Sequence, residues 1–141
     1  MTKIKGKETV LILGASRLGA SIASFCSREG INAIVVDKDK DSFRRVDPSF
    51  GGFLIEGNAA SLPVLRKAGI EEAKEVDIVT GEDNTNIFLA CLVERFFSVP
   101  YINVRLSDPE KEALLPRGRT HLISTSSLAL GCYKSLREKE E

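Results

Sequence analysis

Short apolar runs rich in β-branched residues alternate along the chain with longer segments in which apolar residues recur every three or four positions. The runs have the length and composition of buried strands, and the spacing in the intervening segments is that of amphipathic helices. Six strands are predicted, over residues 9–13, 32–37, 52–56, 76–80, 101–106 and 121–124. Strict alternation of strand and helix predicts an α/β fold, a Rossmann-like doubly wound parallel β-sheet in a three-layer α/β/α arrangement.

Turn and capping residues bound the helices predicted between these strands. The end signals are Gly30, Asp47-Pro48, Ala68-Gly69 and Pro100. The candidate N-caps are Ser61, Asp83 or Asn84, Asp108, and Ser126 or Ser127. Because no linker interrupts the pattern, residues 1–141 are predicted to form a single domain, with flexible ends at about 1–7 and 137–141.

The helix predicted after the fourth strand is apolar over most of its surface. Between Ile87 and Phe97 only Glu94 and Arg95 are polar. A helix needs an apolar stripe of about 100° to pack on one sheet. The outer side of this helix is therefore predicted to join chains into a homo-oligomer, a dimer or larger, and the alternative is a helix buried deeply within its own domain.

Composition places the chain among ordinary globular proteins. Hydrophobic residues make up 43%, charged residues 28%, and the formal net charge is +0, which gives no electrostatic signal for nucleic acid. The opening MTKIKGKETV carries no apolar signal core, so a cytoplasmic location is predicted. Cys26, Cys91 and Cys132 each lie in a helical apolar pattern and are interpreted as small core residues, with no metal site predicted.

The first candidate binding site is GASRLG, residues 14–19, between the first strand and its helix. It matches the G-x-G-x-x-G pattern at Gly14 and Gly19, with Ser16 at the second glycine. The free N–H groups and positive dipole end of the helix favour an anion, and the Ser16 hydroxyl and Arg17 could contact phosphate. Taken alone, the motif fits a plain strand-to-helix turn equally well.

Polar or glycine residues also end the next three strands, on the same carboxyl edge of the predicted sheet. Asp37 is placed to accept hydrogen bonds from ribose hydroxyls and would repel a 2′-phosphate, so NADP is disfavoured; the alternative is an N-cap for the following helix. Residues 56–59 (EGNA) and 80–83 (TGED) end the third and fourth strands. Since ligands of this fold lie across that edge, an adenine nucleotide site is predicted. The alternative is that these polar and glycine residues are there only because the loops need them to turn the chain.

The succession GASRLG, VVDKD, GNAA, LRKAGI, VDIVTGEDNTN, NVRLSDPE and HLISTSSLA resembles the nucleotide-binding N-terminal domain of bacterial Trk/Ktr potassium-uptake regulators, also called the RCK or KTN domain. The resemblance spans nearly the whole chain. It implies a cytoplasmic regulatory module, peripheral to the inner face of the membrane, in which ATP, ADP, AMP or NAD(H) controls the gating of a potassium transporter or channel. The family's C-terminal domain is missing, which implies either a separate C-terminal regulator chain or an excised piece.

The same resemblance implies roles for individual residues. The family usually has Gly where Ser16 stands and often Asp where Asn58 stands. The implied ligand contacts are Gly14, Ala15, Ser16, Arg17, Leu18 and Gly19 around phosphate, Asp37 and Lys38 at the ribose, Asn58 and Ala59 at the adenine, and Thr80, Gly81, Glu82 and Asp83 on the far wall.

The sequence offers no catalytic set. A dehydrogenase needs a proton donor or acceptor beside the nicotinamide, but the one histidine, His121, falls on a late strand. Tyr133 and Lys134 are adjacent on a helix and so diverge. A regulatory binding module is therefore predicted rather than an enzyme. The alternatives are a small NAD-dependent oxidoreductase, or a fragment of one, and a ligand-free assembly scaffold.

Overall fold

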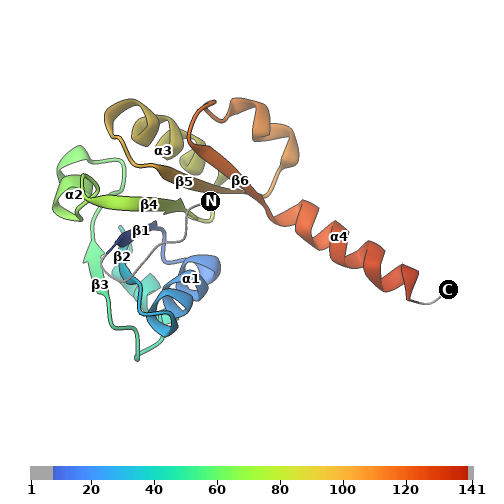
Figure 1. The fold of residues 1–141 in the computed structure, drawn as a ribbon, viewed down its shortest axis with the longest axis horizontal. Helices are drawn as coiled ribbons and strands as arrows, with labels where there is room; N and C mark the ends of the chain where they lie inside the picture. Colours follow the sequence, from blue (N-terminus) through green and yellow to red (C-terminus); the bar gives the residue numbers. More distant parts are fainter. Residues whose placement is uncertain (1–7, 140–141) are drawn as a thin grey trace.

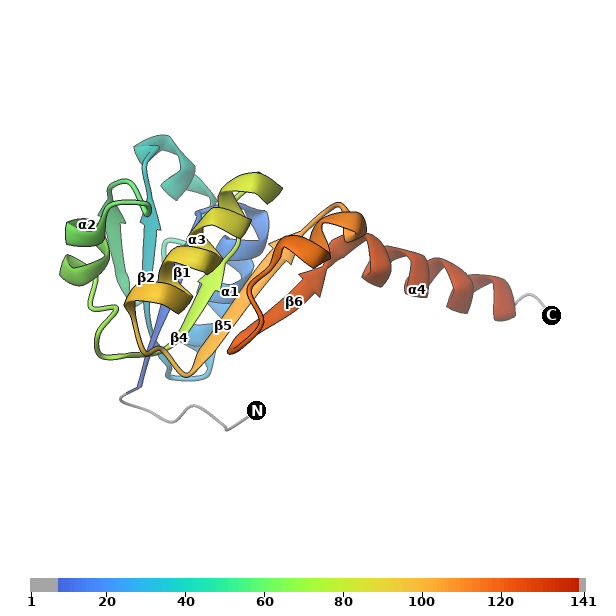
Figure 2. The same cartoon turned by 90° about the horizontal axis from the view of Figure 1, so that it is seen from above.

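Six parallel strands form one sheet with helices on both faces (Figures 1 and 2). The computed structural model describes residues 8–139. The strands are β1 (Thr9–Leu13), β2 (Asn32–Asp37), β3 (Phe53–Glu56), β4 (Ala73–Ile78), β5 (Tyr101–Leu106) and β6 (Thr120–Ser124). Their order is β3-β2-β1-β4-β5-β6, and each neighbouring pair is parallel. This order confirms the predicted Rossmann-like fold and places its switch point between β1 and β4.

The helices divide between the two faces of the sheet. They are α1 (Arg17–Arg28), α2 (Leu62–Lys67), α3 (Asp83–Phe96) and α4 (Thr125–Glu138), with 3-10 helices η1 (Lys40–Arg45) and η2 (Pro109–Leu114). Residues of α2 and α3 share one apolar core, and residues of α1 and η1 share the other. Central strand β1 serves both cores, since Leu11 and Leu13 face the first while Val10 and Ile12 face the second. Burial on both faces explains why β1 is apolar without alternation.

Several element boundaries differ from the sequence predictions. Strand β4 begins at Ala73 and ends at Ile78, because its pairing with β1 includes the polar stretch that the apolar pattern left out. Helix α4 begins at Thr125, since the Ser124 side chain accepts the Ser127 N–H and acts as N-cap. The flexible ends predicted at 1–7, 140 and 141 lie outside the described residues, whereas residues 137 and 138 belong to α4.

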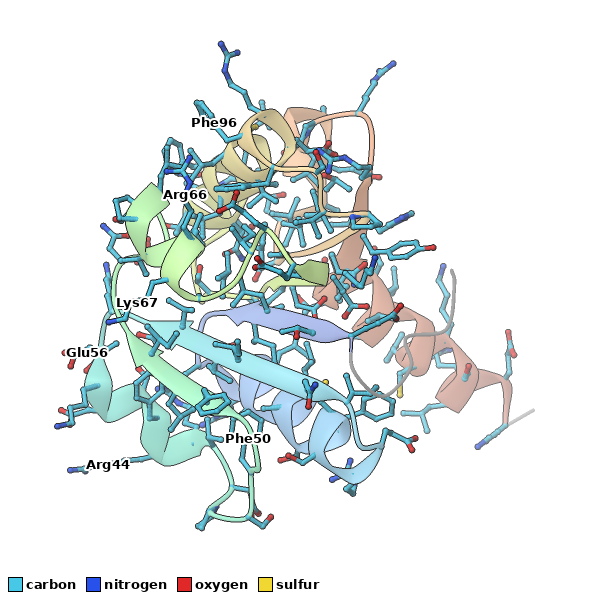
Figure 3. All side chains as sticks on the ribbon, turned by 60° about the vertical axis from the view of Figure 1, so that its left-hand side comes forward. Arg44, Phe50, Glu56, Arg66, Lys67 and Phe96 are labelled. Carbon is cyan, nitrogen blue, oxygen red and sulfur yellow. The ribbon has the colours of Figure 1, made fainter. Side chains whose placement is uncertain are left out.

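Helix α3 buries one side and exposes the other. Leu89, Ala90 and Val93 are buried against the sheet, so the alternative of a helix buried all round within its own domain is wrong. Phe88 and Phe96 are 55% and 51% exposed, and Phe96 lies on the outer side of the helix (Figure 3). The described chain thus presents the apolar surface that the sequence predicted, and contact with another chain stays a prediction.

Helix α4 extends away from the body of the molecule (Figures 1 and 2). Every residue from Ser126 to Lys139 is exposed, including Leu128, Tyr133 and Leu136. The prediction that all three cysteines are core residues is therefore wrong for Cys132 on α4 and for Cys91 on α3, because both thiols are exposed. An amphipathic spacing marks an apolar face, but it does not say whether the chain's own sheet covers that face.

Cys26 and Asp77 are titratable groups buried between α1 and the sheet. Burial, reinforced by Asp77 and Glu75, raises the pKa of the Cys26 thiol to about 11. Asp77 is 2% exposed, and its Oδ1 accepts a hydrogen bond of 2.9 Å from Asn103 Nδ2. Burial first, and then the charge of Glu75 and a hydrogen bond to it, raise the pKa of Asp77 well above its ordinary value. The fold therefore favours the protonated acid.

We expect Asp77→Asn to raise the stability of the protein at neutral pH. Because the pKa of Asp77 is higher in the folded protein than in the unfolded chain, the free energy of unfolding is highest below the unfolded-state pKa of about 4, where the carboxyl group is protonated in both states. It decreases as the pH rises toward the folded-state pKa. An amide keeps the oxygen that Asn103 contacts and carries no charge to desolvate, so thermal melts should show a gain of a few degrees at pH 8, shrinking toward pH 4. Glu112→Gln, at an exposed position of η2, is the control. Equal melting shifts at both pH values would contradict the burial argument.

Candidate functional site

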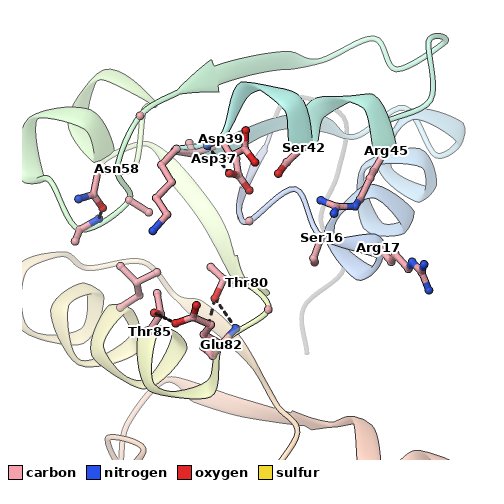
Figure 4. A pocket seen from close by; sticks show the side chains of 18 residues that line it. Ser16, Arg17, Asp37, Asp39, Ser42, Arg45, Asn58, Thr80, Glu82 and Thr85 are labelled. Carbon is pink, nitrogen blue, oxygen red and sulfur yellow. Dashed lines mark hydrogen bonds between the residues drawn. The ribbon is translucent and has the colours of Figure 1, made fainter.

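A cavity of about 580 Å³ opens at the carboxyl ends of the strands beside the switch point (Figure 4). The glycine loop, the ends of β2, β3 and β4, η1 and the start of α3 all contribute to it. Its lining residues are Gly14, Ser16, Arg17, Val36, Asp37, Lys38, Asp39, Ser42, Arg45, Gly57, Asn58, Ala59, Ala60, Thr80, Gly81, Glu82, Thr85 and Leu89. The structure therefore brings together ten of the fourteen ligand contacts that the resemblance implies, at the edge where this fold takes ligands.

Gly14 and Gly19 let the loop between β1 and α1 pass close to the end of β4. Gly14 has φ of 114°, and a Cβ there would stand 2.8 Å from the Thr80 Cα. A Cβ on Gly19 would collide with the Gly14 carbonyl oxygen. Ala15, Leu18 and Gly19 shape this loop without lining the cavity. Both glycines thus have steric reasons for their positions, as the motif predicts.

Ser16 is the N-cap of α1. Its hydroxyl oxygen accepts a hydrogen bond from the Gly19 N–H at 3.1 Å, and its O–H donates a hydrogen bond to the Val79 carbonyl at 2.5 Å. The hydroxyl that we expected to donate to phosphate is thus committed to the fold. Anion binding at this turn would instead use the N–H groups of Arg17 and Leu18, which precede the first hydrogen bond within α1, with the Arg17 side chain beside them.

Asp37 fastens the end of β2 to the glycine loop. Its Oδ2 accepts the Ala15 N–H and its Oδ1 the Asp39 N–H, each at 2.8 Å. The N-cap role considered for Asp37 belongs to Asp39, whose side chain accepts the Asp41 N–H at the start of η1. Each carboxylate oxygen has two acceptor positions, so Asp37 keeps capacity for ribose hydroxyls while its direction is held from two sides.

Helix η1 covers one side of the cavity and supplies lining residues that sequence reasoning missed. Asp39, Ser42 and Arg45 face the cavity from the segment after Asp37 (Figure 4). Arg45 Nη1 donates to the Ala15 carbonyl at 3.1 Å, which ties η1 to the glycine loop. The sequence signal for these residues is the polar segment DKDSFRR, residues 39–45, which begins two positions after the strand-end carboxylate of Asp37.

Asn58 and Ala59 form the turn after β3. The Asn58 side chain accepts the Ala60 N–H at 2.9 Å, and its carbonyl accepts the Ser61 N–H at 2.9 Å. The Gly57 N–H donates to the Asp37 carbonyl at 3.0 Å. The third strand end is thus held beside the second, with the side chain of Asn58 at the cavity.

A buried amide fixes the wall formed by Thr80. Asn86, which has no exposed surface, accepts from the Thr80 N–H at 3.1 Å and from its hydroxyl at 2.5 Å. Its Nδ2 donates to the carbonyls of Thr80 and Arg105 at 3.1 and 2.9 Å. In the sequence this residue is marked only by its place directly before the apolar run that begins at Ile87, which does not indicate these partners.

Asp83 is a correction to the predicted site, because its side chain is directed away from the cavity. Its two oxygens accept the N–H groups of Ser107 and Asp108, each at 2.8 Å. Partial burial opposes ionisation, but these two donors, with Lys111 and Arg105 nearby, hold the pKa of Asp83 below its ordinary value. Asp83 therefore joins α3 to the turn after β5 rather than lining the far wall of the cavity.

The cavity carries groups suited to binding a polar, anionic molecule. Arg17, Lys38 and Arg45 bring cations to it, and Asp37, Asp39 and Glu82 bring acceptors. None of its lining residues is histidine, cysteine or tyrosine. Across residues 8–139, no group of three His, Cys, Asp or Glu side chains could hold a metal ion. None of the helices in that part of the chain is long and apolar enough to span a bilayer.

The switch-point cavity and glycine loop place the chain among Rossmann-type α/β domains. The chain belongs to the TrkA-N domain family, whose sequence model matches residues 10–125. It is similar to the Trk system potassium uptake protein TrkA of Streptomyces coelicolor, with 35% identity over 108 residues, or 77% of this chain and 48% of that protein. The chain thus spans about half the length of that relative, and the family resemblance noted in the sequence is confirmed.

Two solved structures with similar folds were determined with adenine nucleotides. GsuK bound to ADP is 25% identical and superposes with a TM-score of 0.78, covering 96% of this chain and 35% of that one. The GsuK channel bound to NAD is also 25% identical, with a TM-score of 0.79, covering 99% of this chain and 25% of that one.

Proposed function

We propose that this chain is the regulatory nucleotide-binding module of a Trk/Ktr-type potassium uptake system, in which nucleotide occupancy controls transporter gating. The single observation that carries the proposal is the cavity at the switch point, with the glycine loop on one side and Asp37 held against it at 2.8 Å. Membership of the TrkA-N family and the names of the relatives support the link to potassium uptake.

The ligand we propose is an adenine nucleotide, either AMP, ADP or ATP, or NAD(H). A cavity of about 580 Å³ is within the range of cofactor sites, and the two similar GsuK structures are of protein bound to ADP and to NAD. Asp37 and Asp39 both face the expected ribose position, so a 2′-phosphate would meet two carboxylates and NADP is disfavoured. The cavity lining offers no proton-transfer histidine, cysteine or tyrosine, which favours binding over oxidoreductase chemistry.

The partners we propose are a membrane potassium transporter or channel subunit, further copies of this chain, and a separate chain that carries a C-terminal regulator domain. The module would work on the cytoplasmic side of the membrane. The exposed side of α3, with Phe88, Cys91 and Phe96, supports pairing of copies, because large apolar side chains on one helix face cost free energy in water. Light scattering on the purified protein tests this pairing. A protein concentration of tens of micromolar is well above the usual Kd of a stable dimer, so a monomer mass at that concentration would exclude a stable homo-oligomer.

We expect Asp37→Ala to weaken nucleotide binding by about 1–3 kcal/mol, or about 5-fold to 150-fold in Kd, because ribose hydroxyls lose a charged acceptor. Isothermal titration with AMP, ADP, ATP, NAD⁺ and NADH measures the effect, and circular dichroism checks that the variant is folded. Asp41→Ala is the matched control. It removes a nearby carboxylate of the same kind, four residues after Asp37 in η1, that does not line the cavity. If the wild-type chain binds none of these nucleotides at millimolar concentration, the proposed function is wrong. If it binds and Asp37→Ala equals wild type, the assignment of the ribose site is wrong.

A further inference from the structure

Helix α4 is attached to the body of the molecule by hydrogen bonds from its first two residues, Thr125 and Ser126, which we call its root. Ser126 Oγ donates to the Ser107 carbonyl at 2.9 Å, and Thr125 Oγ1 donates to the Leu106 carbonyl at 3.4 Å. From Ser126 onward no residue of the described helix is buried. The direction of α4 is therefore set at this root and not by packing along its length.

Ser107, which receives the root of α4, is connected to the far wall of the cavity by a charged side chain. Arg105 Nη1 donates to the Thr80 carbonyl at 3.1 Å, and its Nη2 donates to the Ser107 hydroxyl at 2.9 Å. Asp83, in the first turn of α3, accepts a hydrogen bond from the Ser107 N–H at 2.8 Å. One guanidinium thus spans from a residue that lines the cavity to the turn that supports α4.

A displacement of Thr80 cannot be absorbed locally. Buried Asn86 makes hydrogen bonds to the N–H, the hydroxyl and the carbonyl of Thr80, and its Nδ2 also binds the Arg105 carbonyl. Any movement of the wall therefore moves α3 or Arg105 with it, or leaves a buried polar atom without its hydrogen-bond partner, which is unfavourable. Both routes lead to Ser107, through Asp83 or through Arg105.

We propose that Arg105 and Asp83 are positioning residues that couple the nucleotide cavity to α4, with Ser107 and Ser126 as the final link. The inference rests on the proposed function, because it needs a ligand that binds one arrangement of the Thr80 wall better than another. Arg105 and Asp83 act through other residues, since neither lines the cavity. Through this coupling, the direction of α4, which packs on nothing else in the described chain, depends on whether the cavity holds nucleotide.

Hydrogen exchange measured by mass spectrometry on the full chain tests the coupling, with and without saturating ADP and, separately, NAD⁺. In the wild type we expect either nucleotide to change exchange in residues 125–132 by about fivefold or more, the lower end of ordinary coupling. Ser126→Ala removes the last link far from the cavity, so the Kd for nucleotide should stay at the wild-type value while the change in α4 is lost. Ser135→Ala is the matched control, because its hydroxyl contacts only the Gly131 carbonyl within α4.

The outcomes separate the two proposals. A nucleotide-dependent change that persists in Ser126→Ala, or a wild type that binds nucleotide without any change in α4, would overturn the coupling and leave nucleotide binding standing. Loss of the change in Ser135→Ala as well would also overturn it, because the root would not be special. Absence of nucleotide binding by the wild type would overturn the proposed function, and the coupling with it.

Discussion

Gly19→Ala is expected to destabilise the fold by about 2–4 kcal/mol and to abolish nucleotide binding. The added methyl group would meet the Gly14 carbonyl oxygen, which belongs to the backbone and cannot rotate away. Relief requires the loop to separate from the first turn of α1, which would also break the hydrogen bond from the Gly19 N–H to Ser16. Urea unfolding measures the loss of stability, and isothermal titration measures the loss of binding.

The same substitution at Gly131 separates this steric effect from helix propensity. Gly131 lies within α4, and a Cβ there would have no neighbouring atom within 4 Å. Gly131→Ala should therefore stabilise the protein by up to about 1 kcal/mol, since alanine is the better helix former. Opposite signs at the two positions are the expected result, and a gain of stability at both would mean that the glycine loop is looser than the structure has it.

The topology and the cavity edge were predictable because each depends on a local pattern. A doubly buried strand such as β1 is apolar throughout, and the chain alternates strand with helix, which together define the sheet. Gly14, Gly19 and Asp37 were found because each has a backbone or strand-end reason visible in the sequence. Residues at successive strand ends then converge at one edge in any parallel sheet.

The directions of polar side chains were not predictable, because their partners lie far along the chain. The Ser16 hydroxyl donates a hydrogen bond to the Val79 carbonyl, 63 positions away, and the Asp83 carboxylate accepts N–H groups of residues about two dozen positions further along the chain. Both fit the expected motif, yet the three-dimensional neighbours decided which atoms they serve. Asn86 was overlooked for the same reason, since nothing local to it indicates four hydrogen bonds across α3, β4 and β5.

Arg119→Ala is expected to lower the free energy of unfolding by about 3 kcal/mol, because it removes the side chain that closes the carboxyl end of α3. The guanidinium donates to the carbonyls of Val99 (2.6 Å), Glu94 (2.8 Å) and Phe97 (3.0 Å), and forms a 3.0 Å ion pair with the Glu94 carboxylate. The Glu94 side chain is only 13% exposed, so water would replace its lost partner poorly. A positive charge at this end also favours the helix dipole.

Two further variants test whether geometry or charge is responsible. Arg119→Lys keeps the charge but loses the planar fork that reaches several acceptors, so it should restore about half of the lost stability at most. Glu71→Ala is the control: its pair with Arg66 is 3.9 Å long and both side chains are more than half exposed, so the change should stay below about 0.5 kcal/mol. The midpoints of urea unfolding, compared at the same dependence of the unfolding free energy on urea concentration, measure the stability of all three variants. Arg119 acts on the carboxyl end of α3, while Asn86 and Asp83 hold its other end. Equal losses for Arg119→Ala and Glu71→Ala would therefore mean that Arg119 contributes no more to the stability of the fold than an exposed ion pair does.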